Sequence, residues 1–593
     1  MRQLRRRSAA FVLPVLMAAA SLCWSAMALA ARPNIVLIIA DDLGFSDIAP
    51  YGSEIETPTL SALADNGILF TNYHTAASCA PTRGMLLTGV DSHRNGVPNI
   101  PETIPPEQAE HENYRGTLSH NVVTVASLLQ DAGYHTYMAG KWHLGKEPDQ
   151  LPFRRGFERT VTMADTGADN WEQKPYLAIY EKANWFADGE EYELPEDFYS
   201  SRFLVDKTIE FISSNAGDGK PFFAYLPFQA VHIPVQAPQE FTDKYMGTYD
   251  SGWHELRTQR RARAEQLGII APDTAMVEMS TTDDWAAYSP EEQRYHAKRM
   301  AVYAGMIDAM DHHIGRLIAY LKKAGQYDNT VFIFTSDNGS EASGGDNPRS
   351  LAMRFALWNQ GYVNDYDTLG LKGSFNNIGP SFASAAASPL NFYKFYAGEG
   401  GMRVPLIIAG DAIPTSIRPT NALAYVTDIT PTILDLTGVN PPTGRFGGHP
   451  VEPIVGRSLL PLVNGEVKRV YSATDTIGYE LGGNAALFQG DYKIVLNIPP
   501  VGDNEWHLYN IVKDPGETND LKESMPERFQ EMLGHYRQYT ADNNVLPLPA
   551  NYNPVFQGIA NGMLDRFGPQ LLLGLLSIVV LLPFYMLYRA RQR

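Results

Sequence analysis

The chain has 593 residues, of which 44% are hydrophobic and 19% are charged. This length is sufficient for several domains with a sizeable core, and the composition is typical of a globular rather than a disordered protein. The formal net charge of -18 at pH 7 argues against nucleic acid or an anionic membrane surface as a partner.

The first 30 residues have the pattern of a secretory signal peptide. Four arginines within residues 2–7 precede an apolar run over residues 9–29, and Ala28-Leu29-Ala30 is a typical cleavage site. We therefore predict a signal peptide over residues 1–30 and an exported protein, with an uncleaved anchor helix as the alternative. Its removal, which includes Cys23, would leave Cys79 as the single cysteine. Because a lone thiol has no internal disulfide partner, we expect a chemical role for Cys79.

After this leader, predicted strands alternate with predicted helices. The apolar run Asn34–Ala40 is typical of a strand buried on both faces of a parallel sheet. Further strands are predicted over residues 68–73, 136–139, 221–229, 331–335 and 404–409, and helices over residues 57–66, 83–88, 123–132, 203–214, 300–323 and 427–436. This alternation predicts an α/β sandwich with active groups at the carboxyl ends of the strands. The Gly-, Ser- and Asn-rich segment 342–393 is predicted to be a long loop over the site.

A change of composition over residues 450–466 predicts a domain boundary. Short strands joined by turns are expected over residues 470–495 and at Trp506–Asn510, followed by a helix over residues 526–539. Residues 547–567 are predicted to be a linker.

The C-terminal end has the pattern of a membrane span. Residues 571–588 are apolar except for Ser577, and three arginines follow among the last five residues. Eighteen helical residues span about 27 Å, close to a hydrocarbon core of roughly 30 Å, and terminal arginines favour the cytoplasm. We predict a transmembrane helix over residues 568–588 and a cytoplasmic tail over residues 589–593, with the rest of the protein at the periplasmic face. A buried core helix and a cleaved lipid-anchor signal are the alternatives.

Two motifs lie in the predicted α/β part. The segment Ser78–Gly89 reads Cys-x-Pro-x-Arg, then two variable residues, two apolar residues and Thr-Gly. Cys79 and Arg83 lie near a predicted helix start, where unpaired N–H groups and the helix dipole favour an anion. The second motif, Gly133–His143, reads Gly-Tyr-His-Thr-Tyr-Met-Ala-Gly-Lys-Trp-His. The two motifs resemble the signatures of the type I sulfatases, most closely those of bacterial arylsulfatases, and the resemblance covers residues 32–546.

The resemblance implies a fold, a modification and a reaction. In this family the motif cysteine is oxidised by a maturation enzyme to formylglycine, whose aldehyde becomes the nucleophile. The implied fold is an alkaline-phosphatase-like α/β sandwich with a large mixed sheet between helices over residues 31–465. A small C-terminal subdomain with an antiparallel sheet would cover residues 466–546. The implied substrate is a small-molecule aryl or alkyl sulfate ester, hydrolysed to a phenol or alcohol and inorganic sulfate.

Acidic and amide side chains follow two of the predicted buried strands. Asp41 and Asp42 follow the first strand, and Asp337 and Asn338 follow the strand over residues 331–335. Hard oxygen donors of this kind suit Ca²⁺, and Mg²⁺ less well. Such pairs are also common as turn or capping residues, but their positions match the sulfatase pattern. We expect a divalent metal site formed by Asp41, Asp42, Asp337, Asn338 and modified Cys79.

Candidate cationic residues lie in three further places. Lys141 and His143 alternate as in an extended segment, so that both side chains point to the same side. His232 follows a predicted strand end and resembles the family histidine near the leaving group. Lys394 lies five residues before Glu399 in Glu-Gly-Gly-Met-Arg-Val-Pro, the spacing of the family motif. Lys372 is the alternative to Lys394.

The resemblance implies a mechanism in which hydrated formylglycine at position 79 attacks sulfur. One group accepts the proton of the attacking hydroxyl, several cations offset charge on the sulfuryl oxygens, one pair protonates the leaving alcohol, and one base regenerates the aldehyde. Asp337 would accept the proton of the attacking hydroxyl, and Arg83, Lys141 and Lys394 would offset the charge. His232 with Lys394 would protonate the leaving alcohol. His143 would be the base that regenerates the aldehyde.

Two other functions remain open from the sequence. The same fold serves phosphate and phosphonate ester hydrolases, which a comparison of rates on paired sulfate and phosphate monoesters would separate. If Cys79 is never oxidised, a non-catalytic, membrane-tethered binding protein is the other alternative.

Overall fold

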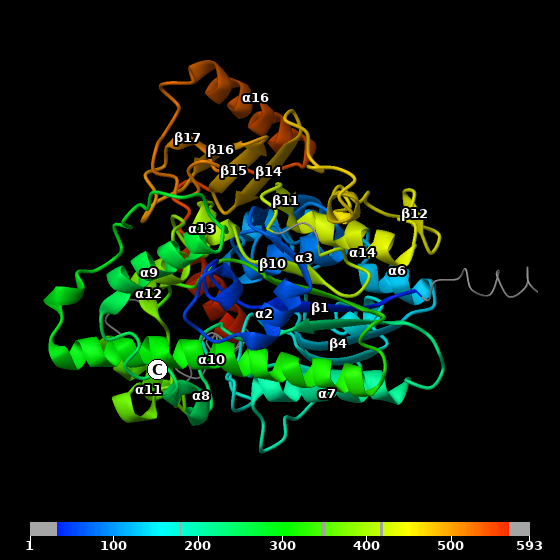
Figure 1. Ribbon diagram of the computed structural model, residues 1–593, viewed down its shortest axis with the longest axis horizontal. Helices are drawn as coiled ribbons and strands as arrows, with labels where there is room; N and C mark the ends of the chain where they lie inside the picture. The colour runs from blue at the N-terminus through cyan, green and yellow to red at the C-terminus, as the bar shows by residue number, and fades with distance from the viewer. Residues whose placement is uncertain (1–31, 178–179, 345–350, 416–418, 569–593) are drawn as a thin grey trace, which may run out of the picture.

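The computed structural model describes residues 32–177, 180–344, 351–415 and 419–568 (Figure 1). The predicted signal peptide, the cytoplasmic tail and all but the first residue of the predicted transmembrane helix lie outside these ranges. Among the described residues, no helix combines the length and apolar character needed to cross a bilayer.

A large mixed sheet forms the centre of the molecule. Within the described residues it has nine strands in the order β2-β10-β9-β1-β8-β4-β5-β6-β7. The five central strands β9, β1, β8, β4 and β5 are parallel, and the strands added at both edges are antiparallel. The strand bounds are β1 Asn34–Ala40, β2 Gly67–Phe70, β4 His135–Lys141, β5 Arg159–Met163, β6 Trp185–Ala187, β7 Glu190–Glu191, β8 Phe222–Pro227, β9 Thr330–Ser336 and β10 Leu406–Ala409.

Helices cover both faces of this sheet (Figure 1). Alternate residues of β1 divide between two cores: Val36 and Ile38 belong to one, and Leu37 and Ile39 belong to the other. On the first face lie α2 Pro58–Asp65, α7 Ser200–Ser214, α8 Gln239–Asp243, α9 Gly252–Gln266 and α10 Pro290–Lys323. On the second lie α3 Cys79–Thr88, α6 Val125–Asp131 and α14 Ile429–Thr437. The predicted sandwich with a large mixed sheet between helices is confirmed.

A small antiparallel sheet lies near the C-terminus, as predicted. It has the order β14-β15-β16-β17 and carries one helix. The bounds are β14 Thr476–Leu481, β15 Asn484–Gln489, β16 Tyr492–Leu496, β17 Trp506–Asn510 and α16 Pro526–Asp542. In Figure 1 this unit sits on the side of α3 and α14, away from α10.

Buried charges join this unit to the main body. Lys493 Nζ of β16 donates to Glu399 Oε1 and to Glu517 Oε1, both at 2.9 Å. Glu399 begins α13 Glu399–Met402 and also contacts His74 Nε2 at 3.0 Å and Arg403 Nη1 at 3.4 Å. We call these five residues, all at most 4% exposed, the interface cluster.

Predictions of local structure differ from the observed one in several places, among them segment 342–393, the helix at Cys79 and the helix predicted over residues 300–323, which begins at Pro290. The segment 342–393 was expected to be a loop, but it contains α11 Leu351–Asn359 and α12 Gly379–Ala386. Its composition predicts turns, yet the small residues of α12 are buried and pack against α9. The helix expected to begin at Arg83 begins at Cys79, since Pro81 is tolerated in a first helical turn, where its missing N–H has no partner to lose.

Candidate active site

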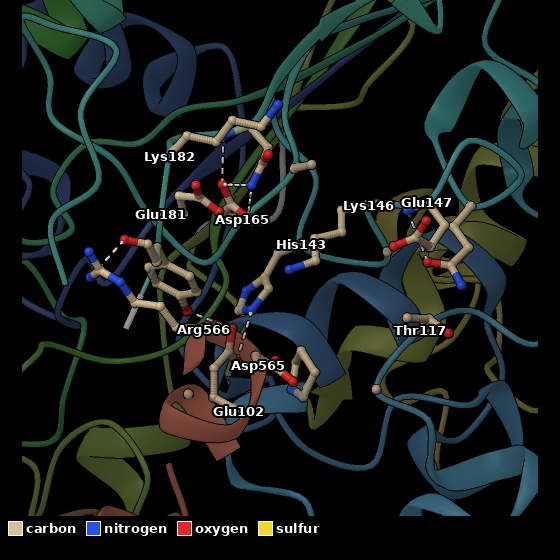
Figure 2. Close-up of a pocket in the computed structure, with 18 residues that line it drawn as sticks. Glu102, Thr117, His143, Lys146, Glu147, Asp165, Glu181, Lys182, Asp565 and Arg566 are labelled. Atoms are coloured by element: carbon tan, nitrogen blue, oxygen red, sulfur yellow. Dashed lines mark hydrogen bonds and ion pairs between the residues drawn. The ribbon is translucent and has the colours of Figure 1, made fainter. Parts of the chain in front are cut away.

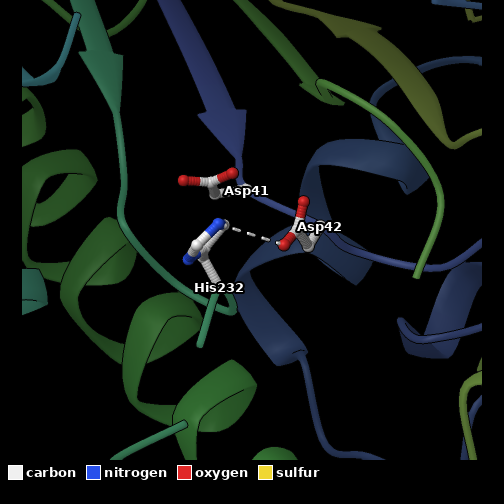
Figure 3. A group of neighbouring side chains, drawn as sticks. All are labelled: Asp41, Asp42 and His232. Carbon is white, nitrogen blue, oxygen red and sulfur yellow. Dashed lines mark ion pairs between the residues drawn. The ribbon is translucent and has the colours of Figure 1, made fainter. Parts of the chain in front are cut away.

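The register of the parallel strands brings the acidic residues together. β1 pairs with β9 so that Ala40 lies opposite Ser336. The next residues, Asp41 and Asp337, therefore leave the sheet side by side. All four predicted metal ligands from these strand ends are completely buried, and Figure 3 shows Asp41 and Asp42 beside His232.

The ends of the strands also have unusual backbone geometry. Asp42 has φ 64 and His143 has φ 56, a left-handed conformation that costs a non-glycine residue on the order of 1–3 kcal/mol and is concentrated at functional sites. Gly140 has φ 138, and a Cβ there would lie 1.8 Å from the carbonyl oxygen of Pro227. Glycine thus permits the close approach of β4 to β8 that positions Lys141 and His143.

The acidic residues have the donor set for a divalent cation. Ligand atoms of Asp41, Cys79 and Asp337 lie within 4.8 Å of one another, as do those of Asp41, Asp42 and His232. Asn338 donates its amide nitrogen to Asp42 at 2.8 Å, but its buried Oδ1 has no hydrogen-bond partner among the described residues. A buried acceptor without a partner is costly, and a cation would satisfy it. These residues therefore fit a hard cation such as Ca²⁺ or Mg²⁺.

Three cationic side chains balance these carboxylates. Arg83 Nη2 lies 2.6 Å from Asp337 Oδ2, Lys141 Nζ lies 2.7 Å from Asp41 Oδ2, and Lys394 Nζ lies 2.8 Å from Asp42 Oδ1. Burial raises the pKa of Asp41, and repulsion from Asp337 raises it further. Burial also acts to raise the pKa of Asp337, but the Arg83 guanidinium outweighs it and lowers this pKa to about 2.

Cys79 lies at the N-terminal end of α3, 1% exposed. Its Sγ is 3.2 Å from His143 Nδ1. Burial acts to raise the pKa of the thiol, but the charges of Lys141, His143 and Lys394 outweigh it and lower the pKa to about 6. Since the thiolate is the reactive form of cysteine, the position is suited to chemistry on sulfur.

His232 follows β8, which lies on the other side of β1 from β9. Its Nε2 is 3.6 Å from Asp42 Oδ2 (Figure 3), and its Nδ1 is 2.6 Å from the carbonyl oxygen of Ile233. Burial lowers its pKa well below the usual value, and Lys394 and Lys141 add to this effect. Tyr176 packs edge-on against the ring, with ring centroids 5.3 Å apart. His232 is therefore neutral in this arrangement.

The structure brings every predicted site residue into this one cluster. The cluster contains Asp41, Asp42, Cys79, Arg83, Lys141, His143, His232, Asp337, Asn338 and Lys394. The alternative lysine, Lys372, has a 56% exposed side chain and pairs with Glu172 instead. Of the two lysines, Lys394 is the one that lies in this cluster.

Two acidic residues of the site were missed from the sequence. Glu341 Oε2 lies 3.0 Å from Lys394 Nζ, and its position four residues after Asp337 is the signal that was available. Glu102 Oε2 lies 3.9 Å from His143 Nε2, and its Oε1 accepts a 2.6 Å hydrogen bond from Tyr180. No periodic pattern surrounds Glu102, so nothing in the sequence pointed to it.

A cavity of about 420 Å³ opens beside His143 (Figure 2). The residues that line it include His143, Glu102, Tyr180, Asp165 and Lys182. Burial acts to raise the pKa of Glu102, but the interactions with His143 and Tyr180 lower it to about 2. Burial lowers the pKa of His143, but Cys79 and Glu102 outweigh this effect and raise it. The cavity thus leads from the surface to an imidazole that touches Cys79.

Comparison with known proteins identifies the family. The sequence profile described as Sulfatase matches residues 33–439. The chain is 37% identical to an arylsulfatase of Klebsiella aerogenes over 434 residues, which cover 72% of this chain and 91% of that protein. The chain belongs to the sulfatase family. It is also 36% identical to an uncharacterized sulfatase of Schizosaccharomyces pombe over 540 residues, 88% of this chain and 96% of that one.

Solved sulfatase structures share the fold. Ps i-CgsB in complex with k-i-k-neocarrahexaose superposes with a TM-score of 0.62 at 23% identity, covering 90% of this chain and 97% of that one. BT4656 in complex with D-glucosamine-2-N,6-O-disulfate gives 0.56 at 21% identity, covering 86% and 98%. The fold is thus the alkaline-phosphatase-like fold of the sulfatases, and the protein is a sulfuric ester hydrolase.

Proposed function

We propose that this sulfatase hydrolyses aryl or alkyl sulfate monoesters, with formylglycine made from Cys79 and one divalent cation, Ca²⁺ in preference to Mg²⁺. The observation that supports this most directly is the surroundings of Cys79. A single buried thiol lies among three cations and next to carboxylates that fit a metal ion. A structural cysteine requires none of these neighbours.

The metal would be held by Asp41, Asp42, Asp337 and Asn338. When bound, it would supply positive charge to a sulfate oxygen and to the oxygen of residue 79. Carboxylate and amide oxygens in this number are a Ca²⁺-type donor set, and the unpaired Asn338 Oδ1 supports its inclusion.

The side chains around residue 79 suit the attack on sulfur. Hydrated formylglycine would supply the nucleophilic hydroxyl. Asp337, with a pKa of about 2, is ionised at neutral pH and so able to accept the proton of that hydroxyl. Arg83 fixes Asp337 through two donors at 2.9 and 2.6 Å. His143, in contact with position 79, is placed to remove the second hydroxyl proton when sulfate leaves.

Lys394 and His232 suit the departure of the alcohol or phenol. Burial acts to lower the pKa of Lys394, but Asp42 and Glu341 raise it well above the usual value. Lys394 is therefore a charged donor, while His232 is neutral without substrate. A sulfate anion beside His232 would raise the pKa of the imidazole and make it a second donor. Lys141 and Arg83 would offset charge on the sulfuryl oxygens.

The mass of the tryptic peptide that contains residue 79 tests the proposal. Conversion of a thiol to an aldehyde lowers the mass by about 18 Da relative to the thiol form, and we expect that lighter peptide together with release of sulfate from 4-nitrophenyl sulfate. Cys79→Ser should lose turnover, because a sulfated serine cannot expel sulfate by forming an aldehyde. An intact thiol in fully active enzyme would overturn the proposal. Faster hydrolysis of 4-nitrophenyl phosphate than of the sulfate would favour the phosphoesterase alternative.

We also propose an exported, membrane-anchored enzyme that meets its maturation enzyme before folding closes the site. The leader pattern over residues 1–30 and the apolar run over residues 571–588 with its terminal arginines support this arrangement. On this view the catalytic domain covers residues 31–465, the C-terminal subdomain residues 466–546, and the anchor residues 568–588. Extraction of membranes at high pH tests it: an anchored protein stays in the pellet, and release into the supernatant contradicts the anchor.

A further inference from the structure

Residues 554–568, all but the last of which belong to the segment 547–567 expected to be a linker, form a helix that packs on the mouth of the cavity. Asn561 Nδ2 donates to the carbonyl oxygens of Glu102 and Ile104 at 2.8 and 2.9 Å. Just before the helix, the Tyr552 hydroxyl donates to the carbonyl of Thr103 at 3.0 Å. Asp565 and Arg566 of this helix line the cavity near Glu102 (Figure 2). The helix is therefore a wall of the cavity beside His143.

The outward side of this helix is apolar. Val555, Phe556, Ile559, Met563 and Leu564 are between 51% and 74% exposed. Their i, i+4, i+8 spacing places them along one side of the helix, while Asn561 makes hydrogen bonds on the enzyme side. A surface helix in water shows the opposite arrangement, with its apolar side against the protein. This inversion indicates a second apolar environment outside the enzyme.

A second exposed apolar group lies on helix α11. Leu351, Phe355 and Trp358 are 86%, 67% and 70% exposed. The inward residue Leu357 belongs to an apolar cluster against which Tyr180 packs. The carbonyl of Tyr180 accepts a 3.5 Å hydrogen bond from Arg566 of the helix 554–568. Both helices are thus linked to the segment at Tyr180, which lines the cavity.

We propose that the exposed apolar side of helix 554–568, together with α11, lies on a zwitterionic phospholipid bilayer, so that the cavity beside His143 opens at the membrane surface. The sequence that follows supports this occupant, because the apolar run over residues 571–588 begins three residues after Gly568, the last described residue. Helices with one strongly apolar side lie in the bilayer interface. The net charge of -18 disfavours anionic lipid, so the contact rests on apolar burial. This inference rests on the proposed function, and it makes the substrate class an amphiphilic sulfate ester held in the bilayer.

Site-specific fluorescence in vesicles tests the membrane contact. The full-length Cys23→Ala/Cys79→Ala protein is reconstituted in phosphatidylcholine vesicles with the dye NBD attached to Phe556→Cys or Met563→Cys. Val467→Cys, at an exposed apolar position 40% accessible, is the matched control. Nitroxide-labelled lipid should quench the dye at positions 556 and 563 at least about threefold more than at 467, as an interfacial helix requires. Equal quenching at the three positions overturns the proposal, and disulfide-linked pairs of the unlabelled Phe556→Cys protein would then identify a second copy as the occupant.

Activity on two substrates tests delivery from the bilayer. The variant Val555→Ser/Phe556→Ser/Met563→Ser and the control Val467→Ser are assayed on soluble 4-nitrophenyl sulfate and on hexadecyl sulfate held in the vesicles. The triple variant should lose about fivefold or more in kcat/KM on the vesicle-held ester alone, since only that ester depends on docking. An equal loss on both substrates, or no hydrolysis of hexadecyl sulfate by the unaltered enzyme, overturns delivery from the bilayer. Failure of every form on both sulfates counts against the proposed function, and the quenching result still decides the membrane contact.

Discussion

The molecule contains two buried clusters of charged side chains, which differ in how many of their polar atoms have hydrogen-bond partners. In the interface cluster, both oxygens of Glu399 and both of Glu517 have hydrogen-bond donors. In the active site, by contrast, Asn338 Oδ1, His143 Nε2 and Glu102 Oε2 are buried with no hydrogen-bond partner among the described residues. Similar residue types thus hold two parts of the chain together in the interface cluster and leave polar atoms available for a ligand in the other cluster.

The difference follows from what each cluster contacts. The interface cluster joins two parts of the same chain, so that folding supplies donors to every carboxylate oxygen in it, and of its side-chain atoms in the described residues only His74 Nδ1 is buried without a hydrogen-bond partner. The active site has unused hydrogen-bonding capacity and two non-glycine residues with positive φ, Asp42 and His143. Functional sites commonly lower stability in this way because their polar groups are arranged for a ligand. Mutations should therefore change activity in one cluster and stability in the other.

The largest effect is expected at Asp337. Asp337→Asn retains an acceptor for Arg83 but removes the carboxylate that accepts a proton and binds metal, so kcat should fall by about 10³-fold or more. The unfolding midpoint should change little, because repulsion with the buried Asp41 is relieved. Sulfate release and calorimetry measure the two quantities, with Asp435→Asn on the exposed side of α14 as the control. A variant that keeps full activity would remove Asp337 from the proposed mechanism.

The opposite outcome is expected at Glu399. Glu399→Gln leaves the buried Lys493 and Arg403 without their shared carboxylate, which should lower the free energy of unfolding by about 3–5 kcal/mol. The protein that remains folded should keep its kcat. Denaturant titration beside activity assays checks both, with the exposed Glu505→Gln as the control. An unchanged unfolding midpoint would show that the interface cluster does not stabilise the contact between the C-terminal unit and the main body.

His93 provides a pH-dependent contact between the same two parts of the chain. Burial acts to lower its pKa, but hydrogen bonds with Asp91 and Glu480 outweigh it and raise the pKa from 6.5 to about 9. A raised pKa means that the folded state holds the proton more tightly. The stabilisation is therefore complete below about pH 6.5 and is lost as pH rises through 9. The difference in unfolding free energy between the unaltered protein and His93→Gln should be at most about 3 kcal/mol at pH 6 and should shrink by pH 10. A difference that is constant with pH would contradict this assignment.

The smallest effect is expected at Glu102. Glu102→Gln keeps an acceptor for Tyr180 but removes the charge that raises the pKa of His143, so kcat should fall by roughly tenfold. If His143 must be neutral to act as a base, the acid limb of the kcat–pH profile should move to lower pH. Profiles of the unaltered enzyme and the variant measure this shift. An acid limb that does not move would mean that Glu102 only packs the cavity wall.

Much of the fold and the metal-binding side of the site could be predicted from the sequence. The apolar run Asn34–Ala40 is strand β1 with the same bounds, because a strand buried on both faces needs an uninterrupted apolar sequence. Asp41, Asp42 and Asp337 directly follow such runs, and parallel pairing brings strand ends to one edge. Local pattern and sheet geometry were therefore sufficient for these residues.

Other features depended on contacts between distant parts of the chain. Glu102 meets His143, and Lys394 rather than Lys372 reaches Asp42, only because strands, helices and loops pack in one particular arrangement. The helices in segment 342–393 were missed because buried small residues mimic the composition of a loop. The outward-facing apolar side of helix 554–568 could not be predicted either, because an amphipathic pattern does not say which side of a helix faces the protein.

The sequence by itself determined the family and the buried strands and was enough to predict the reacting residue, because these depend on short-range patterns and on a lone thiol in a specific motif. Only the tertiary structure decided which charges are paired, which polar atoms remain free for a ligand and which segment lines the cavity. The physical reason is that desolvation and charge pairing depend on distance in space. Residues hundreds of positions apart in the chain fix that distance, and no local pattern encodes it.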